Sequence, residues 1–162
     1  MSCATCHVPD SAPPGGSAGL AGVRWNRIET ARTFEMYVPL SGVRGVLDGP
    51  SQLCLGCHDG VSAADQHGGA ERGRPTPRID GIIGPDLADD HPVGILYPPR
   101  DQRGLPRKGY FARPRGDVQI VLVDGRPRVE CTSCHDPHGS PYDSMLRESL
   151  QGSALCFGCH DL

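Results

Sequence analysis

Eight cysteines and four histidines recur at one fixed spacing along the chain. Each of the four groups reads Cys-x-x-Cys-His, and together they use every cysteine present. Two thiols at this spacing can form thioethers with the two vinyl groups of one porphyrin, and the histidine that follows can bind its iron from one face. The pattern predicts four covalently bound c-type haems. The predicted attachment residues are Cys3, Cys6, Cys54, Cys57, Cys131, Cys134, Cys156 and Cys159, and the predicted proximal ligands are His7, His58, His135 and His160.

Zinc is the alternative cofactor for paired cysteines. A zinc knuckle does not need a histidine directly after its second cysteine, yet here one follows every pair. Histidine makes up 7 of the 162 residues, so composition alone would give four such coincidences on the order of a few times per million. Haem is therefore favoured over zinc or a disulfide framework.

Three histidines lie outside the motifs, namely His67, His91 and His138. A low-spin haem iron takes a second axial ligand, so each is a predicted distal ligand, although a stray histidine is more often a surface residue. His138 follows His135 by three positions and cannot reach the far face of the same haem. We expect it to bind a neighbouring iron in its own two-haem unit, that of the last motif.

The chain reads as two copies of a two-haem unit within a single domain. Residues 1–60 hold the first pair of motifs and residues 131–162 hold the second. Between them, residues 61–130 form an insert rich in Gly, Pro and Arg. Each motif matches its counterpart in the other unit over eight or nine positions, beyond the cysteines and histidine.

One haem is expected to differ from the others, because seven histidines cannot fill the eight axial positions of four irons. The position that corresponds to His138 in the first unit is Asp10, a poor ligand for low-spin haem iron. Met36 is the best substitute, because a thioether suits haem iron and raises its potential. The alternatives are Met36 as core filler with Met145 as the ligand, or an open or water-bound iron.

The predicted fold class is mostly irregular, with a few short helices and one small β-hairpin wrapped around a four-haem stack. Hydrophobic residues are 37% of the chain and aromatic residues 5%, beside 22 Gly and 16 Pro. Such a composition offers little apolar area to offset chain entropy, so the haems must supply it. We expect the chain not to fold without them.

The expected regular elements lie close to the motifs. Val118–Val123 and Arg126–Glu130 flank Asp124-Gly125, which predicts a β-hairpin within residues 118–130 that delivers Cys131 to its haem. Short helices are expected over residues 49–58 and 144–160, each carrying the second motif of its unit.

Charge and hydropathy limit the classes of partner and the cellular location that we expect. The formal charge is −3, and haem propionates would add to it, so a nucleic-acid partner is not expected. The Arg-rich residues 100–115 are read as a solvated loop or as propionate partners. No apolar run reaches the ~20 residues of a membrane span. The first motif begins at residue 3, so we infer that a leader has been removed or replaced and that the protein is periplasmic or extracellular.

The segment Cys-Thr-Ser-Cys-His-Asp-Pro-His-Gly at 131–139, followed by Leu-Cys-Phe-Gly-Cys-His at 155–160, resembles the paired-CxxCH family of multihaem c-type cytochromes. The Asp-His-Pro-Val-Gly segment at 90–94 is similar to distal-ligand segments of that group. A tetrahaem chain of this size resembles the subunits of extracellular cytochrome filaments, or nanowires. The resemblance implies electron transfer through a head-to-tail homopolymer, with redox partner cytochromes and extracellular electron acceptors at its ends.

The motifs near both ends of the chain agree with such a filament, because terminal haems are expected at the surface, where a non-closing contact builds a polymer. Two other functions use the same haems. A soluble periplasmic tetrahaem shuttle needs no polymer, and a multihaem reductase needs one open iron and a proton-delivering pocket. We expect an electron carrier and not an enzyme.

Overall fold

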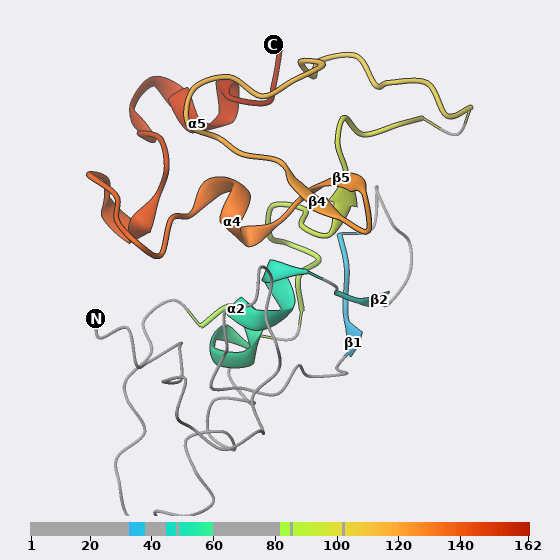
Figure 1. Cartoon of the computed structure of the whole chain (residues 1–162). Coiled ribbons are helices and arrows are strands. Elements are labelled where there is room, and N and C mark those ends of the chain that lie inside the picture. The colour runs from blue at the N-terminus through green and yellow to red at the C-terminus, as the bar shows by residue number, and fades with distance from the viewer. Residues whose placement is uncertain (1–32, 38–44, 48, 60–81, 85, 102) are drawn as a thin grey trace, which may run out of the picture. The chain divides into compact units, whose positions relative to one another are not determined.

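The computed structural model describes residues 33–37, 45–47, 49–59, 82–84, 86–101 and 103–162 (Figure 1). The chain divides into two compact units, one of residues 1–36 and 42–90 and the other of residues 37–41 and 91–162. Most of the described chain is irregular, and the regular elements are short. Each unit is described by itself.

The first unit is built around helix α2, Pro50–His58. Proline at the start of a helix loses no hydrogen bond, and Gly49 enters with a φ of 69° that suits glycine. The helix confirms the one expected over residues 49–58. Strands β1 (Thr33–Phe34) and β2 (Gly45–Val46) form a two-stranded antiparallel sheet. The buried apolar side chains of this unit are Phe34, Leu47, Leu55 and Leu87.

The second unit contains a three-stranded antiparallel sheet in the order β3-β5-β4. Its strands are β3 (Ile95–Leu96), β4 (Val121–Val123) and β5 (Arg126–Val129). Asp124 and Gly125 connect β4 to β5 with φ values of 50° and 72°, and two positive φ values are what a type I′ turn requires. The predicted hairpin is confirmed, although its first strand is shorter than expected. The sequence did not predict β3.

The hairpin leads directly into helix α4, Cys131–Cys134 (Figure 1). Glu130 and Ser133, both buried, close the first turn. The Glu130 N–H donates to Ser133 Oγ at 2.9 Å, and the Ser133 N–H donates to the Glu130 carbonyl at 2.8 Å. Cys131 therefore follows the hairpin as predicted, on a helical turn that the sequence did not predict.

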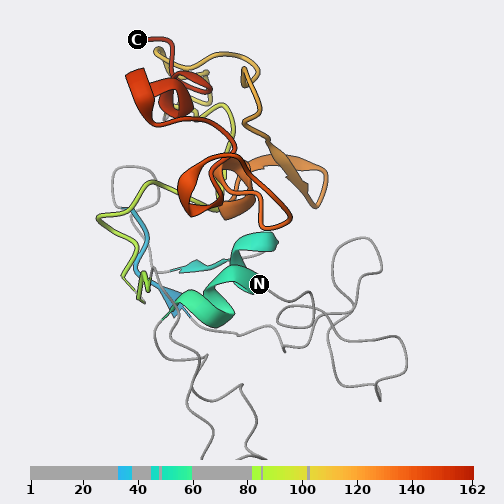
Figure 2. The same cartoon turned by 90° about the vertical axis from the view of Figure 1, so that its left-hand side faces the viewer.

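The helix expected over residues 144–160 is wrong in its extent. The segment consists of η3 (Asp143–Met145), then irregular chain, then η4 (Gln151–Ser153) followed directly by α5 (Ala154–Phe157) (Figure 2). A left-handed residue cannot continue a right-handed helix, so four positive φ values interrupt it. They belong to Ser144, Met145, Gly152 and Ser153.

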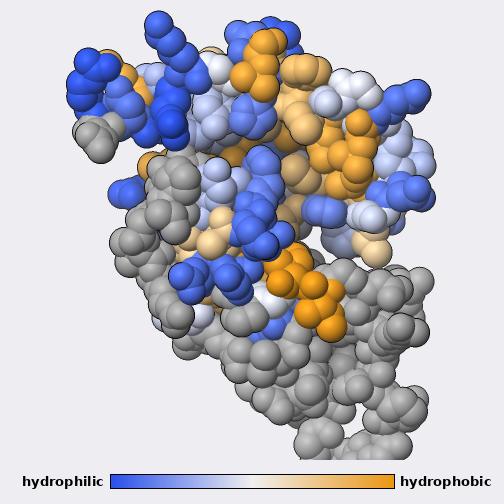
Figure 3. Space-filling model, turned by 180° about the vertical axis from the view of Figure 1, so that it is seen from behind, coloured by the Kyte–Doolittle hydropathy of each residue, from blue (hydrophilic) through white to orange (hydrophobic). Residues whose placement is uncertain are grey.

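The described residues thus confirm the loop-rich part of the predicted fold class, with a few short helices and a small antiparallel sheet. The buried apolar side chains of the second unit are few, and several large apolar side chains are exposed. Figure 3 shows such apolar side chains beside strongly hydrophilic ones on one face. Among the described helices, none has the length and apolar character that crossing a bilayer needs.

Candidate haem-attachment site

The predicted site residues fall into both units. The second motif, at 54–58, belongs to the first unit, and the third and fourth motifs belong to the second unit with His91 and His138. The predicted residues that lie outside the described residues are Cys3, Cys6, His7, Asp10 and His67.

Helix α2 carries the second motif at its C-terminal end. Cys54 has a half-buried thiol, position 57 is three residues further along the helix, and His58 is the last helical residue. The carbonyl of His58 accepts hydrogen bonds from the N–H groups of Ile83 at 2.8 Å and Gly84 at 3.2 Å. Met36, the predicted substitute ligand, is half-buried just after β1.

Helix α4 presents the third motif. Cys131 and Cys134 are three residues apart on one helical turn, so they lie on the same face. His135 follows in extended backbone, and its N–H donates to the Cys131 carbonyl at 3.0 Å.

The ring of His135 is oriented by a main-chain group. Its Nδ1 lies 2.8 Å from the carbonyl oxygen of Ser144. A carbonyl can only accept, so Nδ1 is the donor, and in the neutral ring with this tautomer Nε2 is the nitrogen that keeps its lone pair. A neutral imidazole whose other nitrogen is held by a carbonyl is the form in which histidine binds metals. This orientation suits the predicted role of His135 as a proximal ligand.

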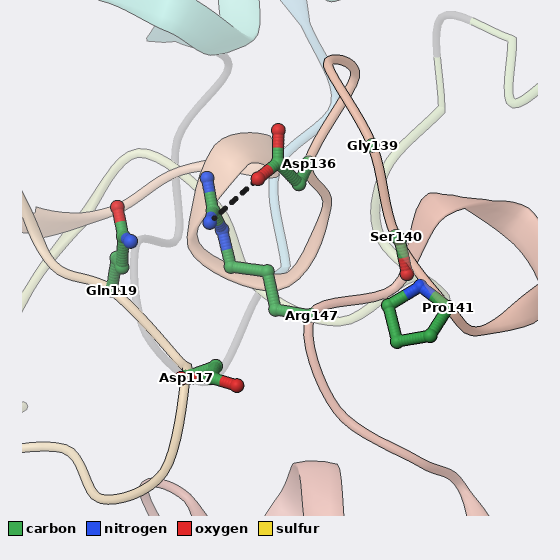
Figure 4. Close-up of a pocket in the computed structure, with 7 residues that line it drawn as sticks. All are labelled: Asp117, Gln119, Asp136, Gly139, Ser140, Pro141 and Arg147. Carbon is green, nitrogen blue, oxygen red and sulfur yellow. Dashed lines mark hydrogen bonds and ion pairs between the residues drawn. The ribbon is translucent and has the colours of Figure 1, made fainter.

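Arg147 connects the third motif to the segment that follows it. Its N–H donates to the Cys134 carbonyl at 2.8 Å, and its Nε donates to the Thr132 carbonyl at 2.9 Å. Its guanidinium also pairs with Asp136 at 3.2 Å, across the polar pocket of Figure 4. Asp136 in turn donates its N–H to the Met145 carbonyl at 2.7 Å. These bonds fix the loop on both sides of His135.

The fourth motif pairs with the loop that contains Tyr110, which lies beside it in Figures 1 and 2. The His160 N–H donates to the Cys156 carbonyl at 2.9 Å, and the Phe111 N–H donates to the Cys159 carbonyl at 2.9 Å. The Tyr110 ring lies 4.6 Å from the His160 ring, tilted by 44°. His160, the predicted proximal ligand of this motif, is therefore held through its backbone and against an aromatic ring.

Of the two described distal candidates, His91 lies next to His160. Its ring centroid is 6.4 Å from that of His160, at an interplanar angle of 83°. Desolvation, and then His160, lower the pKa of His91, which favours the neutral ring that binds metals. The His138 side chain is 79% exposed and has its Nδ1 3.8 Å from the carboxylate of Asp136.

Tyr97 is a site residue that the sequence did not reveal. Its buried hydroxyl lies 2.9 Å from the Phe111 carbonyl and 3.3 Å from the Cys159 carbonyl, and it can donate to either. Burial raises the pKa of Tyr97 far above its usual value, so the hydroxyl stays protonated. No local pattern in the sequence could have indicated a bond to a carbonyl 62 positions away.

The two motifs of the second unit lie close together. Burial raises the pKa of the Cys134 thiol to about 11, and the neighbouring Cys159, Cys131 and Cys156 add to this rise. The predicted attachment residues of two motifs are thus neighbours within one unit. Among the described residues, no group of three or more His, Cys, Asp or Glu is arranged to hold a single metal ion.

The residues present fit a covalently bound haem. Each motif of the second unit offers two thiols followed by a histidine, and the His135 ring has its Nδ1 already engaged by a carbonyl. Large apolar side chains are exposed in the same stretch, as expected of a surface that a flat apolar ring would cover. These side chains are Met145, Leu150 and Phe157.

The comparison with protein families agrees with this geometry. Residues 126–162 match the family model of the doubled CXXCH motif. The matched segment runs from β5 through both motifs of the second unit. A doubled CXXCH motif implies covalently bound c-type haem and supports a multihaem c-type cytochrome that transfers electrons, a class whose domains are typically exported. No curated protein matches the chain.

Proposed function

We propose that this protein transfers electrons through four covalently bound c-type haems, one at each Cys-x-x-Cys-His motif. The observation that carries the proposal is the pair of adjacent attachment sites in the second unit. There Cys134 of the third motif has Cys156 and Cys159 of the fourth among its neighbours, and the segment matches the doubled CXXCH motif. The two other motifs repeat the same residues at the same spacing.

Bound haem supplies one-electron chemistry at iron, and the residues of the chain determine where that iron lies and what it binds. The cysteines fix each ring covalently. His135 offers Nε2 because Ser144 occupies Nδ1, and His160 is held by its backbone bonds and by Tyr110. Short, well-bonded segments of this kind keep the ligands in place as the iron changes its charge.

We further propose that the protein is exported and is the repeating subunit of an extracellular conductive filament. Electrons would pass along its haems between partner cytochromes and extracellular acceptors. Support comes from the resemblance of residues 131–139 and 155–160 to the filament cytochromes, and from the pairing of attachment sites. A soluble periplasmic shuttle uses the same haems without the polymer.

The haem content is tested by the intact mass of protein matured in a host that attaches c-type haem. Four haem additions are expected, and Cys156→Ala/Cys159→Ala should carry three. Fewer than four additions on the fully matured unmodified chain would overturn the proposal. The filament is tested by sedimentation and negative-stain microscopy of native material. Polymers support it, and monomers at high concentration would favour the shuttle.

A further inference from the structure

We propose that His91 and His160 are the two axial ligands of one iron, that of the haem attached at Cys156 and Cys159. The inference rests on the proposed function, because it needs a haem at the fourth motif. It goes further by pairing a particular distal histidine with a particular haem. Sequence reasoning had instead assigned His138 to this iron.

The separation of the two rings is the first argument. An imidazole nitrogen binds a metal ion at about 2 Å, and the ring centroid lies about 1 Å beyond it, so two imidazoles on opposite faces of one iron have centroids about 6 Å apart. The centroids of His91 and His160 are 6.4 Å apart. The near-perpendicular rings, at 83°, are compatible with this, because each ring can rotate about its own bond to the metal.

The second argument is that β5 anchors the segment that carries His91. Three residues after His91, the Gly94 N–H donates to the Val129 carbonyl at 2.7 Å. The Gly94 carbonyl accepts from the guanidinium of Arg128 at 2.9 Å. Strand β3 then pairs with β5, so the backbone beyond His91 has a fixed position. Pro92 restricts His91 itself to extended conformations.

The third argument is that the same segment is bonded to the fourth motif. Tyr97, just after β3, donates its N–H to the Pro127 carbonyl at 2.9 Å. Its hydroxyl reaches the carbonyls of Phe111 and Cys159. A short stretch of chain thus holds His91 near one end and bonds to the motif of His160 at the other. The juxtaposition of the two rings therefore follows from backbone and side-chain bonds on both sides.

Spectroscopy of the complete holoprotein tests the pairing. His91→Ala should keep four haem additions but convert one low-spin haem to high-spin, and added imidazole should restore the low-spin signal. His91→Met should keep all haems low-spin and add the near-infrared band of a sulfur-to-iron transition. If His91→Ala stays wholly low-spin and His91→Met shows no new band, the proposal is wrong.

A single-thioether variant identifies which haem is affected. Cys156→Ala leaves one vinyl group conjugated with its ring, which shifts the visible band of that haem alone while Cys159 keeps it attached. In Cys156→Ala/His91→Ala, the shifted low-spin band should disappear. In the matched control Cys131→Ala/His91→Ala, the shifted band marks the third motif and should remain low-spin.

The outcomes distinguish a failure of the His91–His160 pairing from a failure of the proposed four-haem function. Loss of the shifted band in the Cys131 background, or its retention in the Cys156 background, would show that His91 binds another iron. Fewer than four haems on the unmodified chain would instead count against the proposed function and leave the pairing of the remaining haems measurable.

Discussion

His135 points Nδ1 at the main-chain carbonyl of Ser144, 2.8 Å away, and Ser144 holds that carbonyl from a left-handed backbone with a φ of 55°. The bond fixes the orientation of the ring and increases the electron density at Nε2. A more basic axial nitrogen stabilises the oxidised iron, so the geometry of a strained loop residue is expected to influence a reduction potential.

Substitutions at Ser144 should separate backbone strain from side-chain chemistry. Ser144→Gly removes the strain of a left-handed residue and should leave stability unchanged or slightly higher. Ser144→Val places a β-branched side chain at the same φ and should lower the free energy of unfolding by about 1–2 kcal/mol. By weakening the hydrogen bond it should also raise the potential of the third-motif haem. Denaturation and redox titration of the holoprotein check both effects, and identical behaviour of the two variants would contradict them.

Arg147 should be important for stability because it bonds to both sides of the third motif. Lysine cannot reproduce the planar guanidinium that reaches Thr132 and Asp136 together, so Arg147→Lys should lower the free energy of unfolding by about 1–3 kcal/mol. Arg103→Lys is the matched control. Arg103 is 79% exposed and pairs with Asp101, so a change of only about 0–1 kcal/mol is expected. Equal losses in the two variants, measured by urea denaturation, would contradict this role.

His138 remains a predicted distal ligand, now of an iron other than the one paired with His91. His138→Ala should turn one haem high-spin while four haem additions remain. Because the two histidines are assigned to different irons, His91→Ala/His138→Ala should show two high-spin haems, the sum of the single variants. Electron paramagnetic resonance counts them. A wholly low-spin spectrum of His138→Ala would remove this residue from the ligand set.

The haem that lacks a histidine should reveal its substitute. With seven histidines for eight axial positions, at least one iron per chain must differ, even if neighbouring subunits exchange ligands. If Met36 fills the gap, the native protein should show the near-infrared sulfur band and one potential above the others. Met36→Ala should abolish both, and Met145→Ala is its control. A band lost only in Met145→Ala would transfer the role, and a native high-spin signal would indicate an open iron.

The features that the sequence predicted well depend on local chemistry. The Asp124-Gly125 pair tolerates the positive φ values of its turn, and Pro50 suits the start of α2. The prediction of a helix over residues 144–160 was wrong because Ser144 and Met145 adopt left-handed backbone conformations, which their side chains do not favour. Such conformations are imposed by surrounding contacts, which a local pattern does not contain.

In the functional site, too, local features were predictable from the sequence and long-range contacts were not. The Cys-x-x-Cys-His spacing is local covalent chemistry and is readable from the sequence alone. The closeness of His91 to His160 and the bonds of Tyr97 to Phe111 and Cys159 depend on residues far apart in the chain. Only the folded arrangement brings them together, so the sequence could predict His91 as a distal ligand but not that it lies beside His160.

Gly158 sits between the cysteines of the fourth motif, and its backbone touches the entry to the hairpin. A Cβ at this position would lie 2.5 Å from the buried Val118 side chain and 3.0 Å from the Leu155 carbonyl. Gln119, which follows Val118 in the chain, donates its N–H to the carbonyl of Ser133 in the third motif at 3.1 Å. A methyl group added at Gly158 in the fourth motif would thus displace Val118, and the displacement would reach the third motif through the bond of Gln119. Across related sequences, positions 118 and 158 should therefore vary together in size, with any larger residue at 158 matched by a smaller one at 118.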